Sequence, residues 1–216
     1  MTIQEIRTFP EIKALIEAGD RALGVLEYTE HGYAHVGIVS HTTGDILQSF
    51  GYDERICELG RIAGYIHDIG NAVNRVSHAI TGGALAFAAL GGKMDPEDLA
   101  EIITAIGNHD EGTAVPVSPI TAALILADKS DVRRSRVQVK EDRFDIHDRV
   151  NYAVVDSSLS VNATAKTVTL QLAIDTELCP VMDYFEIFQA RMQLCRSAAD
   201  FLGAQFKLII NDTQIL

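Results

Sequence analysis

The sequence contains no tryptophan and no hydrophobic run long enough to cross a bilayer. Its longest stretch with little charge, HAITGGALAFAALGG at residues 78–92, is shorter than the roughly 20 apolar residues that a membrane helix needs, and it contains four glycines. The first 20 residues include acids and a proline where a signal peptide would have a basic start and an apolar centre. These absences predict a cytoplasmic protein with no membrane partner.

Cysteine is also scarce. Cys57, Cys179 and Cys195 are far apart, odd in number and form no CxxC pair. A disulfide framework or a thiolate zinc site needs paired spacings, so we expect reduced thiols in the hydrophobic core.

Positive charge is the third deficit. The sequence has 18 lysines and arginines but 30 acidic residues, which gives a formal net charge of −12. An acidic surface offers no counter-charge to duplex nucleic acid or to an anionic membrane, so the charge argues against both partners. The composition, 47% hydrophobic and 22% charged, is typical of a soluble globular protein.

The pattern of the first 155 residues predicts a compact bundle of about six or seven helices. Apolar residues recur at helical spacing, and the helices are bounded by capping residues such as Asp53, Asp95–Pro96 and Ser118–Pro119, and by glycines such as Gly19. The expected helical segments are 9–19, 35–51, 54–68, 77–92, 95–109 and 118–131.

The pattern of polar and apolar residues changes after residue 155. Residues 159–175 alternate polar and apolar side chains around a turn at Asn162–Lys166, which predicts a hairpin. Residues 182–203 predict a long helix, and residues 206–212 a third strand. We therefore predict a mostly α fold in two parts: a helical domain, 1–155, and a small α+β subdomain, 156–216.

Six of the seven histidines lie in the first 110 residues. Several of them, with two aspartates, fall at the ends of successive predicted helices: His35, His67–Asp68, His78, His109 and Asp128. If these helices pack antiparallel, the side chains meet at one end of the bundle, where helical proteins build metal sites. Imidazole and carboxylate ligands without thiolates suit Fe, Mn, Zn or Ni.

The same ordered residues resemble the HD-domain metal-dependent phosphohydrolase superfamily. HDIGN at residues 67–71 looks like its central motif, and LILADKSD at 124–131 looks like its closing aspartate. SHAITGGALA and AIGNHDEG are similar to segments of the members with a two-metal centre, and the pattern is nearest to the bacterial HD-type hydrolases of symmetrical dinucleoside tetraphosphates. The resemblance covers residues 28–135 and implies an HD-type helical bundle.

The resemblance also implies a ligand set. The first metal would be held by His35, His67, Asp68 and Asp128, and the second by His78 and His109, with Asp68 bridging the two. A carboxylate has two oxygens and can span metals about 3.5–4 Å apart, which a histidine cannot. His67 and Asp68 would be the catalytic residues. Two divalent cations per chain are expected, Fe or Mn first, with Zn, Ni, Mg and Co as alternatives.

Other residues carry weaker indications of function. Lys129, Arg133 and Arg134 follow Asp128 and would contact phosphate, since arginine forks match phosphate oxygens, although a charged helix end explains them equally well. His31 lies four residues before His35 and could contact the substrate or a metal ligand. Arg75 is either a phosphate contact or a surface residue. The pair His147–Asp148 matches nothing in the family, and we expect it on a solvated helix face.

These observations predict an enzyme that hydrolyses a phosphate ester or anhydride, most simply of a nucleotide or a dinucleoside polyphosphate, with a metal-activated water. The partner would be a phosphorylated small molecule, and a homodimer is left open. One alternative is a catalytically silent module that binds a metal or a nucleotide and regulates another protein. A further alternative is a di-iron oxygenase on the same helical scaffold.

Overall fold

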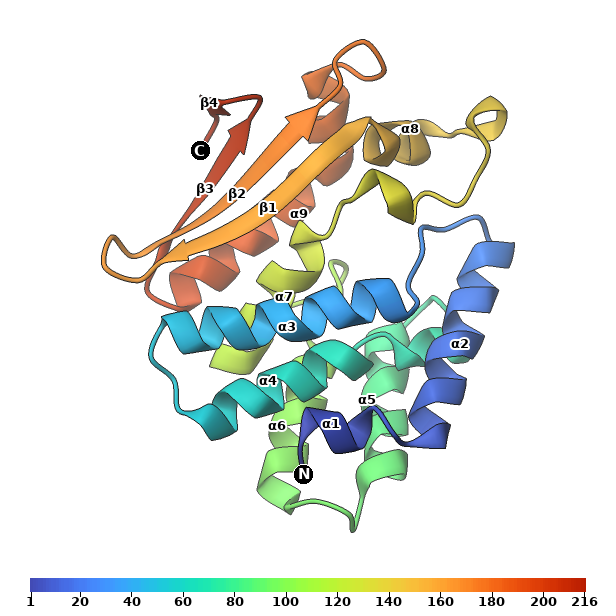
Figure 1. The fold of residues 1–216 in the computed structure, drawn as a ribbon, viewed down its shortest axis with the longest axis vertical. Helices are drawn as coiled ribbons and strands as arrows, with labels where there is room; N and C mark the ends of the chain where they lie inside the picture. The colour runs from blue at the N-terminus through green and yellow to red at the C-terminus, as the bar shows by residue number, and fades with distance from the viewer.

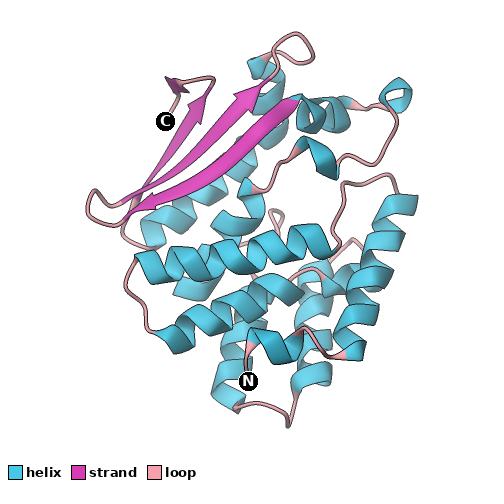
Figure 2. Ribbon diagram, viewed as in Figure 1, coloured by secondary structure: helices cyan, strands magenta, loops and turns pink.

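The computed structural model describes residues 1–216, and nine α-helices and a four-stranded sheet form the fold (Figures 1 and 2). The mostly α prediction is confirmed. The helices are α1 (Ile3–Ile6), α2 (Pro10–Val25), α3 (Tyr33–Ser49), α4 (Glu54–Ile66), α5 (His78–Leu90), α6 (Pro96–Gly107), α7 (Pro119–Ser130), α8 (Ile146–Ala153) and α9 (Val181–Phe201). Three short 3₁₀ turns are η1 (Ile69–Ala72), η2 (Arg134–Arg136) and η3 (Glu141–Arg143).

The predicted caps start the helices as expected. Asp53 accepts a hydrogen bond from the backbone of Ile56, and Asp95 and Ser118 cap α6 and α7, each followed by a proline in the first turn. These side chains satisfy backbone N–H groups that have no partner within the helix. Three of the long helices therefore begin where local sequence signals place them.

The sequence prediction was wrong at the end of α2. The helix continues through Gly19 to Val25. A Cβ on Gly19 would lie 3.3 Å from the backbone nitrogen of Ala72 and from the Cβ of Asn71. The glycine therefore allows α2 to approach η1 closely, and it does not end the helix.

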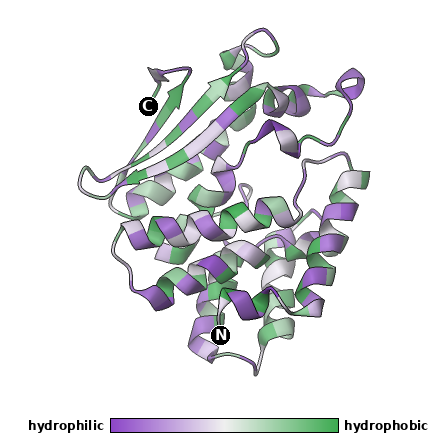
Figure 3. Ribbon diagram, in the orientation of Figure 1, coloured by the Kyte–Doolittle hydropathy of each residue, from purple (hydrophilic) through white to green (hydrophobic).

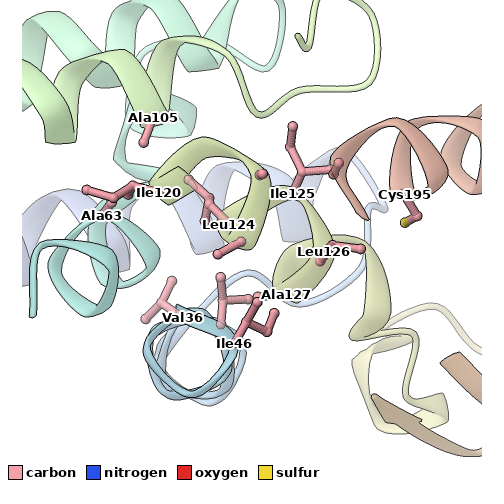
Figure 4. Close-up of a cluster of buried hydrophobic side chains, with 14 of the residues drawn as sticks. Val36, Ile46, Ala63, Ala105, Ile120, Leu124, Ile125, Leu126, Ala127 and Cys195 are labelled. Atoms are coloured by element: carbon pink, nitrogen blue, oxygen red, sulfur yellow. The ribbon is translucent and has the colours of Figure 1, made fainter. Parts of the chain in front are cut away.

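Helix α7 is the centre of the bundle. It contacts α3, α4, α6 and α9, and every residue from Ile120 to Ala127 is buried (Figure 4). A helix that is apolar on all sides has to be enclosed by other elements, which explains why its sequence shows no polar face. Its last turn brings Asp128 to one end of the bundle.

The C-terminal part forms a mixed sheet in the order β1-β2-β3-β4, with α9 packed against β2 and β3 (Figure 1). The strands are β1 (Val154–Asn162), β2 (Thr167–Ile174), β3 (Gln205–Ile210) and β4 (Thr213–Gln214). β1 and β2 form the predicted antiparallel hairpin, while β3 returns parallel to β2 after α9. The two-residue β4, which is exposed and pairs antiparallel with β3, was not predicted.

One hydrophobic core connects the bundle and the sheet. A continuous cluster of 47 buried residues extends from Ile3 in α1 to Ile210 in β3, and α9 packs on α7. Hydrophilic and hydrophobic residues alternate along the helices (Figure 3), as expected of helices with one buried face. The expected division near residue 155 coincides with the change from α8 to β1, but the two parts share their packing. None of the helices is both long enough and apolar enough to cross a membrane.

Candidate metal centre

Six predicted ligands from five helix ends lie together at one end of the bundle. They come from the first turn of α3 (His35), the end of α4 (His67 and Asp68), the start of α5 (His78), the turn after α6 (His109) and the last turn of α7 (Asp128). The four histidines and Asp68 are buried, and the side chain of Asp128 is 11% exposed. The antiparallel arrangement expected from the short turns therefore brings these groups together.

Asp68 occupies the middle of this cluster. Its Oδ2 lies 3.1 Å from Nε2 of His67 and 3.7 Å from Nε2 of His35. Its Oδ1 lies 3.3 Å from Nε2 of His78 and 3.7 Å from Nε2 of His109. Each carboxylate oxygen thus faces its own pair of imidazoles.

Asp128 completes the group on one side of Asp68. Its Oδ1 lies 3.3 Å from Nε2 of His35 and 3.8 Å from Nε2 of His67. Its Oδ2 accepts a hydrogen bond from the ammonium of Lys129 at 2.6 Å. One oxygen is therefore turned to the imidazoles and the other to a cation.

Hydrogen bonds at Nδ1 orient the four imidazoles. The Nδ1 atoms of His67, His78 and His109 donate to the carbonyl oxygens of Gly64, Arg75 and Ile106 at 2.9, 3.0 and 2.6 Å, and Nδ1 of His35 donates to Oδ2 of Asp131 at 2.8 Å. In a neutral imidazole whose Nδ1 donates, Nε2 carries a lone pair. All four lone pairs converge around Asp68.

Two of these lone pairs lack any partner within the protein. Nε2 of His35 and of His67 is buried and makes no hydrogen bond. Nε2 of His78 lies 3.3 Å from Nε2 of His109, so two acceptors face each other. Two triplets of donor atoms, His35/His67/Asp128 and His67/Asp68/His109, are close enough to share an ion. Because buried polar atoms without partners are costly, this donor set fits a bound cation, and the His/Asp cluster can hold a metal ion.

The electrostatics keep the carboxylates charged. Burial alone would raise the pKa of Asp68, but the imidazoles of His67, His109 and His78 around it hold that pKa well below its usual value. For Asp128, burial likewise opposes ionisation, while Lys129 and His35 hold the pKa well below normal. Both side chains are therefore anionic at neutral pH and are suited to bind a cation.

The sequence prediction missed Asp131, which is buried behind His35. Arg133 donates to both carboxylate oxygens of Asp131, at 2.5 and 3.0 Å, and buried Arg136 donates to its backbone oxygen at 2.5 Å. A carboxylate that accepts the Nδ1 proton of a ligating histidine fixes the orientation of the ring and raises its basicity. The only sequence signal for this role was the position of Asp131 three residues after Asp128.

Of the residues predicted to contact the substrate, His31, Lys129 and Arg133 lie at the site and Arg134 does not. Nε2 of His31 is 3.9 Å from Oδ2 of Asp68, and its ring packs edge-on against His35. Lys129 and Arg133 line the cavity described below, but each is paired with an aspartate. Arg134 does not line this cavity, because its guanidinium donates to the carbonyl of Tyr152 and lies over that ring.

A cavity of about 620 Å³ opens onto the cluster. Its walls come from the α2–α3 connection, the end of α7, the segment before α8, and α8 and α9. The interpretation of His147–Asp148 as a solvated pair needs correction. Asp148 is buried and forms a reciprocal cap with Asp145 at the start of α8, and the exposed His147 lies on the cavity wall. His41, by contrast, is exposed and pairs with Asp45.

Helix α9 also contributes to the wall. Arg191 donates to Oε1 of Glu111 at 2.6 Å and lies over the ring of Phe188, and all three residues line the cavity. No motif in residues 156–216 had indicated a contribution to the site. The C-terminal part therefore supplies side chains next to the candidate ligands.

Comparison with known proteins finds a similar sequence, but that protein has no assigned activity. No family model matches the chain. An uncharacterized protein from Methanocaldococcus jannaschii is 26% identical over 180 residues, which cover 72% of this chain and 69% of that protein.

Proposed function

We propose that this protein is a metal-dependent phosphohydrolase with an HD-type site that binds two divalent cations. The observation that carries the proposal is the position of Asp68, whose two oxygens each face a different pair of imidazole Nε2 atoms. One cation would be held by His35, His67, Asp68 and Asp128, and the other by Asp68, His78 and His109. The resemblance of the HDIGN and LILADKSD segments to the HD superfamily supports the same assignment.

The protein would contribute to catalysis mainly by holding the metal ligands in position before a metal binds. When bound, two divalent cations lower the pKa of water towards neutrality and neutralise phosphoryl oxygens. The Nδ1 hydrogen bonds hold the imidazole rings in place before any ligand arrives, and Asp131 does so for His35. Because the four imidazoles and Asp68 are buried, their interactions with a bound cation would be screened less by solvent than at the surface.

The cavity supports a phosphorylated small molecule as substrate. Six cationic side chains line it although the protein has a net charge of −12: Arg75, Lys129, Arg133, Arg136, Arg143 and Arg191. Its volume of about 620 Å³ falls within the range of about 300–1,000 Å³ that small-molecule sites occupy. A nucleotide or a dinucleoside polyphosphate has the required charge. Of the substrate contacts predicted from the sequence, Lys129, Arg133 and His31 line this cavity and are the contacts that we propose.

The test is metal content followed by turnover. The protein is purified without chelator or added metal, and its metals are counted by elemental analysis. Phosphate or nucleotide release is then assayed with dinucleoside polyphosphates and nucleotides, with Mn²⁺ or Fe²⁺ supplied. About two ions per chain and measurable release are expected. A protein that holds metal but releases nothing from any phosphorylated substrate would instead be the regulatory module, and oxygen uptake with an alcohol substrate would indicate the oxygenase.

A further inference from the structure

The cationic side chains of the cavity differ in how far they are neutralised. Most of them already have a carboxylate partner: Lys129 pairs with Asp128, Arg133 with Asp131, Arg143 with Glu27 and Arg191 with Glu111. Arg136 is buried and donates to the backbone oxygens of Glu30 and Asp131. A phosphate that approached any of these five would compete with an existing partner.

Arg75 is the exception. Its nearest carboxylate oxygen, Oδ1 of Asp110, is 3.9 Å from Nη2, beyond hydrogen-bond distance. Nε and Nη2 make no hydrogen bond within the protein, and the side chain is 31% exposed on the cavity wall. Arg75 therefore has donors without a hydrogen-bond partner, and an anion that bound them would displace only the long contact with Asp110.

The position of Arg75 is set by its neighbours in the site. Its Nη1 lies 3.4 Å from Oδ1 of Asn71, and Nδ2 of Asn71 donates to Oδ1 of Asp68 at 3.0 Å. The same Nη1 lies 3.3 Å from Nε2 of His78, and the guanidinium lies over the ring of Tyr28. The free donors are thus held beside the His78 and His109 side of the cluster.

We infer that Arg75 binds the phosphoryl oxygens of the substrate on the His78/His109 side of the site. The inference rests on the proposed function for the class of ligand. The planar guanidinium matches two phosphate oxygens at once, and a charged hydrogen bond is strongest where the cation has no competing anion. Asn71 and Tyr28 position the fork, and the paired arginines shape the remaining wall.

The experiment measures binding of inorganic phosphate by calorimetry to the protein as purified, with the metal content of each sample determined in parallel. Arg75→Gln, Arg75→Lys and the matched control Arg149→Gln, a paired arginine outside the cavity, are compared with the wild type. Arg75→Gln should weaken phosphate binding about tenfold or more, because it removes a charge-assisted fork. Arg75→Lys keeps the charge without the fork and should fall between the two. Arg149→Gln should change the affinity less than about twofold, since that side chain lies outside the cavity and is paired with Asp183.

The inference is overturned if Arg75→Gln binds phosphate as tightly as the wild type at equal metal content. It is also overturned if the wild type binds no phosphate. Turnover assays of the same variants distinguish a failure of this inference from a failure of the proposed function. Phosphate release with an unchanged KM in Arg75→Gln would refute the role of Arg75 alone, whereas Arg75-dependent phosphate binding without any release would refute hydrolysis alone.

Discussion

A single hydrogen bond decides what each buried histidine of the cluster can bind. Because Nδ1 of His67 and of His109 donates to a carbonyl three residues earlier, the ring is held against the end of its own helix. Nε2 is then directed to Asp68 with its lone pair available. The ligand geometry is therefore built from local contacts at the helix ends, before any cation is bound.

Asp68→Ala should abolish metal binding and turnover, because it removes a carboxylate that faces both pairs of imidazoles. Metal content by elemental analysis and phosphate release are the measurements. His41→Ala is the matched control, since that imidazole is exposed and lies outside the cavity, and it should leave both properties unchanged. Full metal content and activity in Asp68→Ala would show that the metal assignment is wrong.

Asp131→Asn should weaken metal binding about 10- to 100-fold, the usual effect of removing a carboxylate partner from a ligating histidine. The asparagine can still accept the Nδ1 proton of His35, but the negative charge behind the ring is lost. Titration of the metal-free protein against a competing chelator gives the affinity, and thermal denaturation checks that the variant is folded. Affinity equal to that of the wild type would mean that Asp131 does not support His35 as a ligand.

At the scale of the elements, the site depends on the close approach of η1 and α5. A Cβ on Gly70 would lie 1.9 Å from the carbonyl oxygen of His78 and 2.6 Å from the backbone nitrogen of Gly82. A Cβ on Gly82 would in turn lie 3.1 Å from Ile106 in α6. These glycines let the backbones of η1 and α5 meet and let Ile106 of α6 pack against them, and this packing brings His78 to Asp68.

Gly70→Ala should therefore destabilise the protein by about 3 kcal/mol, because the backbone atoms that it meets cannot move aside without shifting α5. Gly37→Ala is the matched control. Gly37 lies within α3, and its Cβ would meet nothing within 4 Å, so alanine should stabilise the helix by about 0.5–1 kcal/mol. Urea denaturation of the two variants measures both effects. If the two alanines had equal effects, close backbone packing at Gly70 would not be the cause.

At the scale of the whole molecule, α9 ties the sheet to the bundle through buried side chains. Cys195 of α9 lies beside α7 (Figure 4), and it is buried, as are Tyr184 and Met192 of the same helix. Burial raises the pKa of the Cys195 thiol to about 12. The expectation that Cys57, Cys179 and Cys195 are unpaired thiols of the core is confirmed.

The raised pKa of Cys195 predicts a loss of stability in alkali. The thiol of the unfolded chain releases its proton near pH 8.5–9, whereas the folded protein retains it to about pH 12. Between these values the unfolded state binds fewer protons, so the free energy of unfolding falls as pH rises. Cys195 alone should remove about 1–2 kcal/mol by pH 10. Urea denaturation at pH 7, 8.5 and 10 should show a shallower decline for Cys195→Ala, and parallel curves would contradict the assignment.

Local signals in the sequence determined most of the helices and the order of the candidate ligands. Capping by Asp53, Asp95 and Ser118 and the periodic apolar residues involve neighbours within a few positions, so they act the same way in any tertiary context. The third strand and the long helix α9 followed from equally local patterns. Short turns then favoured antiparallel neighbours, which was enough to expect His35, His67–Asp68, His78, His109 and Asp128 at one end of the bundle.

The tertiary structure alone decided what surrounds those ligands. Asp131 reaches His35 across 96 positions in the chain, and Arg191 enters the cavity wall from α9. Among the arginines, packing turned Arg134 away to Tyr152 and left Arg75 with no carboxylate within hydrogen-bond distance. Such contacts depend on how whole helices pack against each other, and a residue's near neighbours in sequence carry no information about a partner that only the folded core brings close.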